Sequence, residues 1–355
     1  MQILLILIGI TILVTVVVDV LITTLTLGGG GPLTSRISSW IWHGALFIHR
    51  KHCSHRFLAI VGWSMLIGIP LLWFILVWVG WTFIFSADEM AVVSSSTKLP
   101  ANLWHRIYFT GYTISTLGLG DFEPKGIFWQ ICTSIASTFG FSLVTLMFAY
   151  LLPVVSSGTR KRQLAVYIAT LGGTPDEIVT RAWNGDNFGQ FDQHLINLTS
   201  QLVNLGETHL NYPVLHYFHS LERSRANALS VVALDEALTL LQYGVSPSHH
   251  PDSATLDPAR RAIAAYLNTI ESAYFKSASE TPPLPSVELL RKHGIPTVSD
   301  RQFLETTKAL THRRQLLLAL IEHDGWNWDA IASSHTTNRA CHLDDSSLVD
   351  QVILH

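Results

Sequence analysis

The stretch Thr113–Asp121, TISTLGLGD, decides the fold, because the rest of the chain supplies what is needed to hold it inside a membrane. Glycine and leucine alternate at positions 117 to 120. A row of backbone carbonyls that face one axis needs left-handed dihedral angles at every second residue, and Gly118 and Gly120 adopt them without a Cβ clash. Thr116 adds a hydroxyl group at the inner end. Four such loops around an axis would replace the water shell of a cation with oxygen atoms.

The composition indicates a membrane protein with a second, polar part. The chain has 355 residues, a mean hydropathy of +0.31 and 14% charged residues, which is unusual for a soluble enzyme. Three stretches near the N-terminus carry almost no charge, whereas the sequence after Arg160 is polar and has a helical pattern. The three cysteines are too few and too scattered for a disulfide framework or a zinc site; they are Cys53, Cys132 and Cys341.

Residues 1–27 form an apolar run long enough to span a bilayer, with Asp19 as their one charge. The run lacks the basic start and the small-residue cleavage site of a secretory signal peptide. The following loop carries only basic charges, so the positive-inside rule places it in the cytoplasm; these are Arg36, Arg50, Lys51 and Arg56. We therefore predict an additional N-terminal transmembrane helix at 1–27, with the N-terminus outside. Asp19 is either a functional group or a protonated side chain bonded to a neighbouring hydroxyl.

The basic cytoplasmic loop, residues 28–56, begins with a helix break at Gly28–Pro32. In Ile37–His49, aromatic and aliphatic residues are separated by polar and basic ones, a pattern that predicts an interfacial helix along the inner leaflet. The loop also contains side chains that could bind a metal ion, although a solvated basic segment explains them more simply; they are His43, His49, His52, Cys53 and His55.

Two long uncharged stretches flank the glycine loop, and they predict an outer helix at 57–85 and an inner helix at 126–156. Between them, residues 103–114 are mainly apolar, follow the capping residue Asn102 and are too few to cross a bilayer. They predict a re-entrant pore helix whose C-terminal dipole favours a cation below the loop. A second basic cluster at 160–162 gives the same orientation as the first.

The segment Thr116–Asp121, TLGLGD, resembles the T-V-G-Y-G-D filter of the pore-loop potassium channel superfamily. The variant S-T-[IL]-G-L-G-D is similar to the second pore loop of animal two-pore-domain channels. The resemblance covers about Phe57–Ser156, a two-helix pore domain at 57–156. It implies a homotetramer in which the filter, residues 116–121, binds K⁺ at Thr116, Leu117, Gly118 and Leu119, with Gly120 completing it and Asp121 at the outer mouth.

The inner helix carries a predicted gate. Gly140 lies 20 residues after Gly120, at the glycine hinge of the family, and Pro153 lies near the cytoplasmic end. Apolar residues recur every four positions between them and predict a ring that closes the pore by dewetting, with its narrowest point at Phe148; the stripe comprises Val144, Phe148 and Leu152.

The remaining sequence predicts a helical cytosolic regulatory domain at 160–340 and a tail at 341–355. From Arg160 onward there are 16 basic and 21 acidic residues, a balance of −5 that argues against nucleic acid as a partner. Helix-like patterns occur at 188–210, 226–243, 258–275 and 300–322, and Thr174 begins a capping signal. No dinucleotide-binding loop or known family is recognised there. A set of polar residues permits metal binding, pH sensing or a solvated face; it comprises His209, His216, His219 and Glu222.

These patterns predict an all-α, multi-pass protein of the cell membrane with a cytoplasmic C-terminal domain. The favoured function is a homotetrameric, potassium-selective channel that conducts passively and is controlled by an unknown ligand or protein at the cytosolic domain. One alternative is a membrane-anchored sensor or scaffold whose pore loop does not conduct. Another is a weakly selective cation channel, because Leu119 replaces the aromatic residue of the family filter. No motif indicates an enzyme, and we expect no cofactor besides the permeant K⁺.

Overall fold

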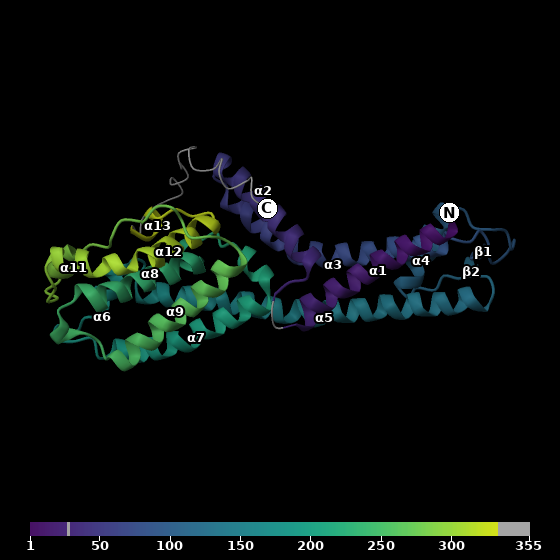
Figure 1. Cartoon of the computed structure of the whole chain (residues 1–355). Helices are drawn as coiled ribbons and strands as arrows, with labels where there is room; N and C mark the ends of the chain where they lie inside the picture. Colours follow the sequence, from purple (N-terminus) through teal and green to yellow (C-terminus); the bar gives the residue numbers. More distant parts are fainter. Residues whose placement is uncertain (27–28, 333–355) are drawn as a thin grey trace. The chain divides into compact units, whose positions relative to one another are not determined.

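A computed structural model describes residues 1–26 and 29–332 of the chain (Figure 1). The chain divides into two compact units. Of the described residues, the membrane unit comprises 1–26, 29–38, 63–155 and 211–213, and the helical unit comprises 39–62, 156–210 and 214–332. Gly28, Cys341 and the predicted tail at 341–355 lie outside the described residues.

Within the described residues, three helices are long and apolar enough to cross a membrane: α1 (Gln2–Leu25), α3 (His55–Phe85) and α5 (Ile127–Leu171). They include the three spans expected from the sequence, and Figure 1 shows them lying along one another in the membrane unit. Helix α1 packs directly on α3, because a Cβ at Gly9 would lie 2.6 Å from the carbonyl oxygen of Gly80. The additional N-terminal helix is therefore a packed part of this unit.

Helix α5 is longer than the predicted inner helix, which was expected to end at residue 156. It continues without interruption through Pro153 and the basic residues 160–162 to Leu171. Charge alone does not end a helix, and the next glycine pair is Gly172–Gly173. There the chain turns so closely that a Cβ at Gly172 would lie 2.5 Å from the backbone nitrogen of Ile178.

Helix α4 (Leu103–Ile114) has the twelve residues expected of the re-entrant helix, and Asn102 caps it by accepting a hydrogen bond from the N–H of His105. On either side lie β1 (Val92–Ser94) and β2 (Phe122–Pro124), which pair as a two-stranded antiparallel ribbon. This ribbon was not predicted, because strands of three residues leave no periodic signal.

Helix α2 (Pro32–His52) starts earlier than the predicted interfacial helix, and one of its faces is covered by protein. Trp42, Leu46 and His49 are buried, whereas Trp40 and Phe47 are exposed. The face that carries Trp42 is therefore not available for the predicted contact with the inner leaflet. Contact of the opposite face with lipid stays a prediction.

All residues of α8 (Asn227–Thr239) are buried. Figure 1 shows this helix among the other helices of the helical unit. Around it are α6 (Pro175–Ala182), α7 (Phe191–Asn211), α9 (Ser253–Ala273), α10 (Val287–Lys292), α11 (Asp300–Thr307), α12 (Thr311–His323) and α13 (Asp329–Ala332). The buried carboxylates of α8 are neutralised by arginines: Asp235 pairs with Arg260 and Arg313, and Glu236 pairs with Arg314. Desolvation of two acidic groups is offset by these charged partners.

The predicted helix boundaries in this unit hold in part. The capping signal at Thr174 begins α6, since its hydroxyl accepts from the N–H of Glu177. Helix α9 starts at Ser253, five residues before the expected Pro258, because Asp252 caps it. The helix expected at 300–322 is broken by a 3-10 turn at Lys308–Leu310.

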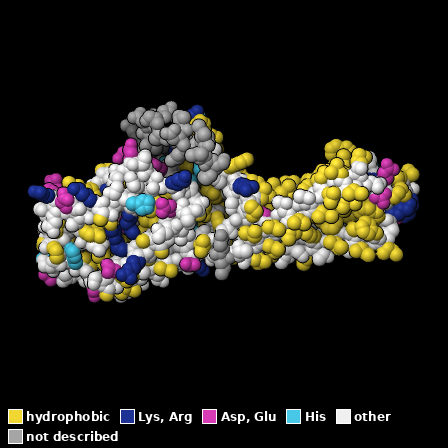
Figure 2. All heavy atoms as spheres, in the orientation of Figure 1, with side chains coloured by type: hydrophobic (Ala, Val, Ile, Leu, Met, Phe, Trp, Pro, Cys, Tyr) yellow, Lys and Arg dark blue, Asp and Glu magenta, His cyan; other side chains and the backbone are white. Residues whose placement is uncertain are grey.

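The two units differ in surface chemistry. Figure 2 shows hydrophobic side chains over the visible face of the membrane unit, whereas charged side chains gather mainly on the helical unit. Many large apolar side chains of α1 and α3 are exposed, among them Leu7, Val14, Ile67, Leu71 and Ile75. An apolar surface of this extent requires lipid around it.

Candidate ion-conduction site

The glycine loop leaves the C-terminal end of α4 and is fixed there by its own backbone. The N–H groups of Leu117 and Gly118 both donate to the carbonyl oxygen of Tyr112, at 2.9 and 3.4 Å. The N–H of Thr116 donates to the carbonyl of Thr113. The last carbonyls of α4 are thus used to turn the chain sharply into the loop.

The loop has the alternating backbone expected from its sequence. Gly118 and Gly120 have φ angles of +58° and +82°. Thr116 also has a positive φ, +60°, which the sequence did not predict because a β-branched residue rarely adopts it. Such strain persists only where the surrounding structure imposes it, and it is concentrated at functional sites.

The outer end of the loop is tied to its surroundings by side-chain hydrogen bonds. The Tyr108 hydroxyl donates to Oδ2 of Asp121 at 2.8 Å, and the Tyr112 hydroxyl donates to the carbonyl of Phe122 at 2.5 Å. The N–H of Ser95 donates to the carbonyl of Asp121. Between these anchors every residue from Ser115 to Asp121 is exposed in the single chain. Leu117 and Leu119 are 67% and 53% exposed.

Helix α3 supports α4 from the side. The indole N–H of Trp78 donates to the carbonyl of Ile107 at 2.8 Å, and the Trp78 ring lies so close that a Cβ at Gly111 would be 2.6 Å from it. Phe85 meets Phe109 edge-on with ring centres 5.1 Å apart. Aromatic side chains of α3 thus pack against α4 within one chain.

Helix α5 supports α4 from the other side, at Gly140. A Cβ at this position would overlap the carbonyl oxygen of Ile114, the last residue of α4. The sequence predicted a hinge here; the structure gives the glycine a packing role, and the hinge stays a prediction. Close backbone approach has the same sequence signal as flexibility, which is why the contact could not be foreseen.

The predicted gate residues form an exposed face of α5. Val144, Phe148 and Leu152 are 37%, 62% and 70% exposed. Two residues that the sequence analysis missed, Phe141 and Val155, extend the same helical stripe and are also exposed. Their signal was present, because they lie three residues before Val144 and three after Leu152. The chain itself leaves this face available to an axis or a neighbouring molecule.

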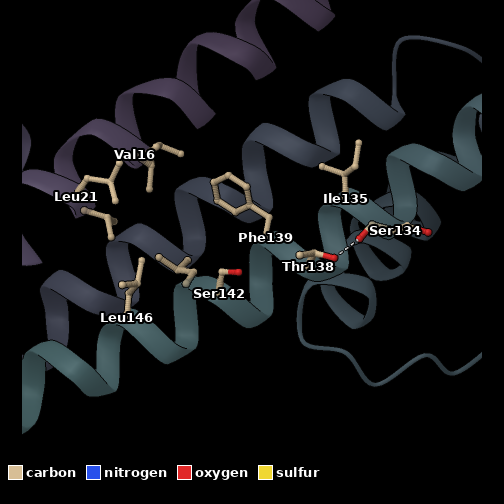
Figure 3. Close-up of a pocket in the computed structure, with 11 residues that line it drawn as sticks. Val16, Leu21, Ser134, Ile135, Thr138, Phe139, Ser142 and Leu146 are labelled. Carbon is tan, nitrogen blue, oxygen red and sulfur yellow. Dashed lines mark hydrogen bonds between the residues drawn. The ribbon is translucent and has the colours of Figure 1, made fainter. Parts of the chain in front are cut away.

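A cavity of about 460 Å³ lies between α1 and α5 (Figure 3). Its walls are mainly aliphatic, with side chains such as Val16 and Leu21 of α1 opposite Leu146 of α5. Two of the hydroxyl groups in the wall bond within α5: Thr138 donates to the carbonyl of Ser134, and Ser134 to that of Gln130. This cavity therefore offers mainly apolar contacts.

Asp19 is completely buried and binds two other elements of the membrane unit. Its carboxylate accepts from the backbone N–H groups of Leu33 and Thr34, at 2.7 and 3.1 Å, from the Thr34 hydroxyl, and from the indole of Trp73 at 2.8 Å. Four donors suit an ionised carboxylate, which only accepts. Asp19 thus caps the first turn of α2 from another helix.

The absence of a capping side chain on α2 itself explains this arrangement. Gly31 stands at the N-terminal boundary of α2, and a Cβ there would overlap the Asp19 carboxylate. One hypothesis from the sequence placed a neighbouring hydroxyl group on Asp19, and the Thr34 hydroxyl is such a group. The three N–H donors, from Leu33, Thr34 and Trp73, were not predicted. A functional role of Asp19 in conduction stays untested.

The histidines are brought together in pairs from distant segments. His55 Nδ1 lies 3.0 Å from Nε2 of His219, and His216 Nε2 lies 2.8 Å from Nδ1 of His323. Among residues 1–26 and 29–332, no three histidine, cysteine or acidic side chains are arranged to hold a metal ion. The sequence could not predict these pairs, because the partners are 164 and 107 residues apart.

Comparison with known proteins gives two similarities. Residues 71–157 match a protein family described as an ion channel; the match covers α4, the glycine loop, the C-terminal part of α3 and most of α5. The chain is also 36% identical over 321 residues to the uncharacterized membrane protein YdjJ of Bacillus subtilis, with 90% of this chain and 94% of that protein covered. No solved structure matches the chain.

Proposed function

The chain belongs to the family of the Bacillus subtilis membrane protein YdjJ and contains an ion channel region, and from this premise we propose that it is a potassium-selective channel. Four copies would surround one axis, each contributing one glycine loop. Dehydrated K⁺ would bind the carbonyl oxygens of Thr116, Leu117, Gly118 and Leu119, with the Thr116 hydroxyl at the inner end.

The observation that carries this proposal is the alternation of positive φ at residues 116, 118 and 120. An ordinary glycine turn has no need of such angles at three alternate positions, one of them a threonine. Alternate angles turn successive carbonyls to the same side, as a row of cation ligands requires. The position of the loop, after a twelve-residue helix and between two membrane-spanning helices, supports the same reading.

The proposal includes a gate and an orientation. The stripe at Val144, Phe148 and Leu152 would face the axis and close it by dewetting, with Gly140 and Pro153 allowing α5 to bend. The basic clusters at residues 36–56 and 160–162 support a cytoplasmic location for the helical unit, with the N-terminus outside the cell. The helical unit would control the gate in response to a ligand or protein.

The test is ion flux from liposomes that contain the purified full-length protein. We expect K⁺ to pass at least about a hundredfold faster than Na⁺, because oxygens spaced for K⁺ replace its hydration shell. Gly118→Ala abolishes the flux, because alanine strongly disfavours a φ of +58°.

Gly126→Ala is the matched control. Gly126 also has a positive φ, +85°, and neither glycine has an atom within 4 Å of its Cβ position, but Gly126 lies outside the loop. Alanine raises the backbone conformational energy by a similar amount at both positions, because both have a positive φ. Only Gly118→Ala should lose conduction. Equal K⁺ and Na⁺ flux in the parent protein would instead identify a weakly selective cation channel. A folded protein without flux would identify a non-conducting sensor or scaffold.

A further inference from the structure

The helical unit contains a buried histidine pair that joins its C-terminal part to the segment before α8. His216 lies in the 3-10 turn that ends at Tyr217, and His323 is the last residue of α12. Their ring nitrogens, Nε2 and Nδ1, are 2.8 Å apart. A hydrogen bond between two imidazoles needs one unprotonated nitrogen as acceptor, so it is lost when both rings are protonated.

The buried face of α2 lies directly on this pair. The indole of Trp42 donates to the carbonyl oxygen of His323 at 3.1 Å, and its ring centre is 5.5 Å from that of Tyr217. The His43 ring meets the His323 ring edge-on at 5.6 Å. About two turns further along α2, Nε2 of His49 is 3.1 Å from the carbonyl oxygen of Gly325. The segment 39–62 is therefore held at the pair and next to it.

The surroundings favour neutral rings. Burial lowers the pKa of His323 from 6.5 to about 3, with smaller contributions from His43 and Arg50 and an opposing one from Asp324. Burial also holds the pKa of His216 well below its ordinary value, and nearby His323, Lys161, His209 and His43 act in the same direction. Both imidazole rings also contact aromatic side chains. Tyr274 stacks on His216, and Phe275 lies beside His323.

The second pair, His55 and His219, has a different environment. Oδ1 of Asp324 lies 3.8 Å from Nδ1 of His219. The His55 ring stacks on Trp326 at 4.2 Å, a contact that does not depend on charge. The contacts of this pair therefore include a carboxylate and an indole ring.

We propose that the His216–His323 pair is an acid-operated latch, which holds segment 39–62 on the helical unit while neutral and releases it when protonated. Protonation would place two positive charges 2.8 Å apart under Trp42, with Lys161 and Arg50 nearby. The release would free the cytoplasmic end of α3, the predicted outer helix of the pore. Any effect on conduction rests on the proposed channel function, whereas the latch itself does not.

The direction of the pH effect follows from linkage. Once segment 39–62 has left and water reaches His323, its pKa returns toward the ordinary value of 6.5, whereas in the latched state burial holds it at about 3. Between these values the released state binds more protons, so falling pH favours release and rising pH restores the latch. For His323 alone the release equilibrium shifts about thirtyfold between neutral pH and pH 5.

The test is hydrogen–deuterium exchange of the full-length protein in detergent at pH 7.5 and pH 5.0, with rates corrected for intrinsic exchange. We expect exchange in segment 39–62 to rise about tenfold or more at pH 5.0 while the buried helix α8 stays protected. In His216→Gln/His323→Asn the response falls below about threefold, because the amides keep a hydrogen bond but do not titrate. His323→Asn alone tests the same point if the double variant does not fold.

His312→Gln is the matched control, because it removes an exposed histidine from the same helix, α12, and should respond as the parent does. Equal exchange at both pH values in the parent, or an unchanged response in the double variant, would overturn the latch. Flux measurements separate this outcome from the channel proposal. If exchange depends on pH but no ions pass, the channel proposal is wrong and the latch stands. If ions pass but exchange does not depend on pH, the latch is wrong and the channel proposal stands.

Discussion

The glycine loop and the Asp19 site are two polar features of the membrane unit, and they are stabilised in opposite ways. Every oxygen of the Asp19 carboxylate is bonded by the chain's own donors, and the residue has no exposed surface. The loop is fixed at its ends, but residues 115–121 are all exposed. A polar group satisfied within one chain stabilises the fold, whereas carbonyls left exposed inside a membrane protein are available for a ligand or a neighbouring subunit.

Replacing Asp19 by alanine should have the largest effect on folding. It leaves the N–H groups of Leu33 and Thr34 and the indole of Trp73 without their acceptor in a buried site. We expect a loss of about 4 kcal/mol in the free energy of unfolding, measured by SDS denaturation. Asp19→Asn keeps one acceptor oxygen and should lose about half as much.

Thr24→Ala is the control for this prediction, since Thr24 bonds only to the carbonyl of Val20 in its own helix. Its effect should stay below about 0.5 kcal/mol. If Asp19→Asn left stability unchanged while it altered conduction, the carboxylate would have a functional role, and the contrast with the loop would fail.

Gly140→Ala should have the second largest effect. The added Cβ would overlap the carbonyl of Ile114, so α5 must move away from the end of α4 at a cost of about 2 kcal/mol. Gly68→Ala is the control, because this helical glycine of α3 has open space around its Cβ position. It should be neutral or slightly stabilising. Both variants are measured in the same denaturation assay. Equal stability would show that the contact between Gly140 and the carbonyl of Ile114, where the glycine loop leaves α4, can relax without cost.

Tyr108→Phe should have the smallest effect, and it acts on the loop itself. The change removes the hydrogen bond to Asp121 but keeps the ring, a loss of about 1 kcal/mol. We expect the ratio of Na⁺ to K⁺ flux to rise about fivefold, because the outer end of the loop is less firmly held. Tyr167→Phe removes a comparable hydroxyl bond, to His194 in the helical unit, and should leave that ratio unchanged.

The sequence predicted the loop and its neighbours well because their signals are local. Asn102 marks the start of α4, and the glycines at 118 and 120 specify their own dihedral angles. The strain at Thr116 was not foreseen, because nothing in a threonine indicates a positive φ; the bonds of Leu117 and Gly118 to Tyr112 impose it.

The contacts of the helical unit could not be predicted, because they join residues far apart in the chain. A histidine in an isolated segment gives the same pattern whether it is solvated or paired, and His216 meets His323 only through the fold. The same holds for Trp42, which has the spacing of an interfacial anchor and is buried in protein. The extension of α5 to Leu171 was missed for a local reason, because a basic cluster was taken as its end.

The capping of α2 by Asp19 has a consequence for biosynthesis. When α1 has left the ribosome and entered the bilayer, its carboxylate has none of its partners, and an uncompensated charge at that depth costs about 3 kcal/mol. Leu33 and Thr34 arrive within fifteen residues, but Trp73 is 54 residues downstream. We therefore expect the first helix to stay near the insertion machinery until the third has been synthesised, so that the order of translation becomes part of how this membrane unit is assembled.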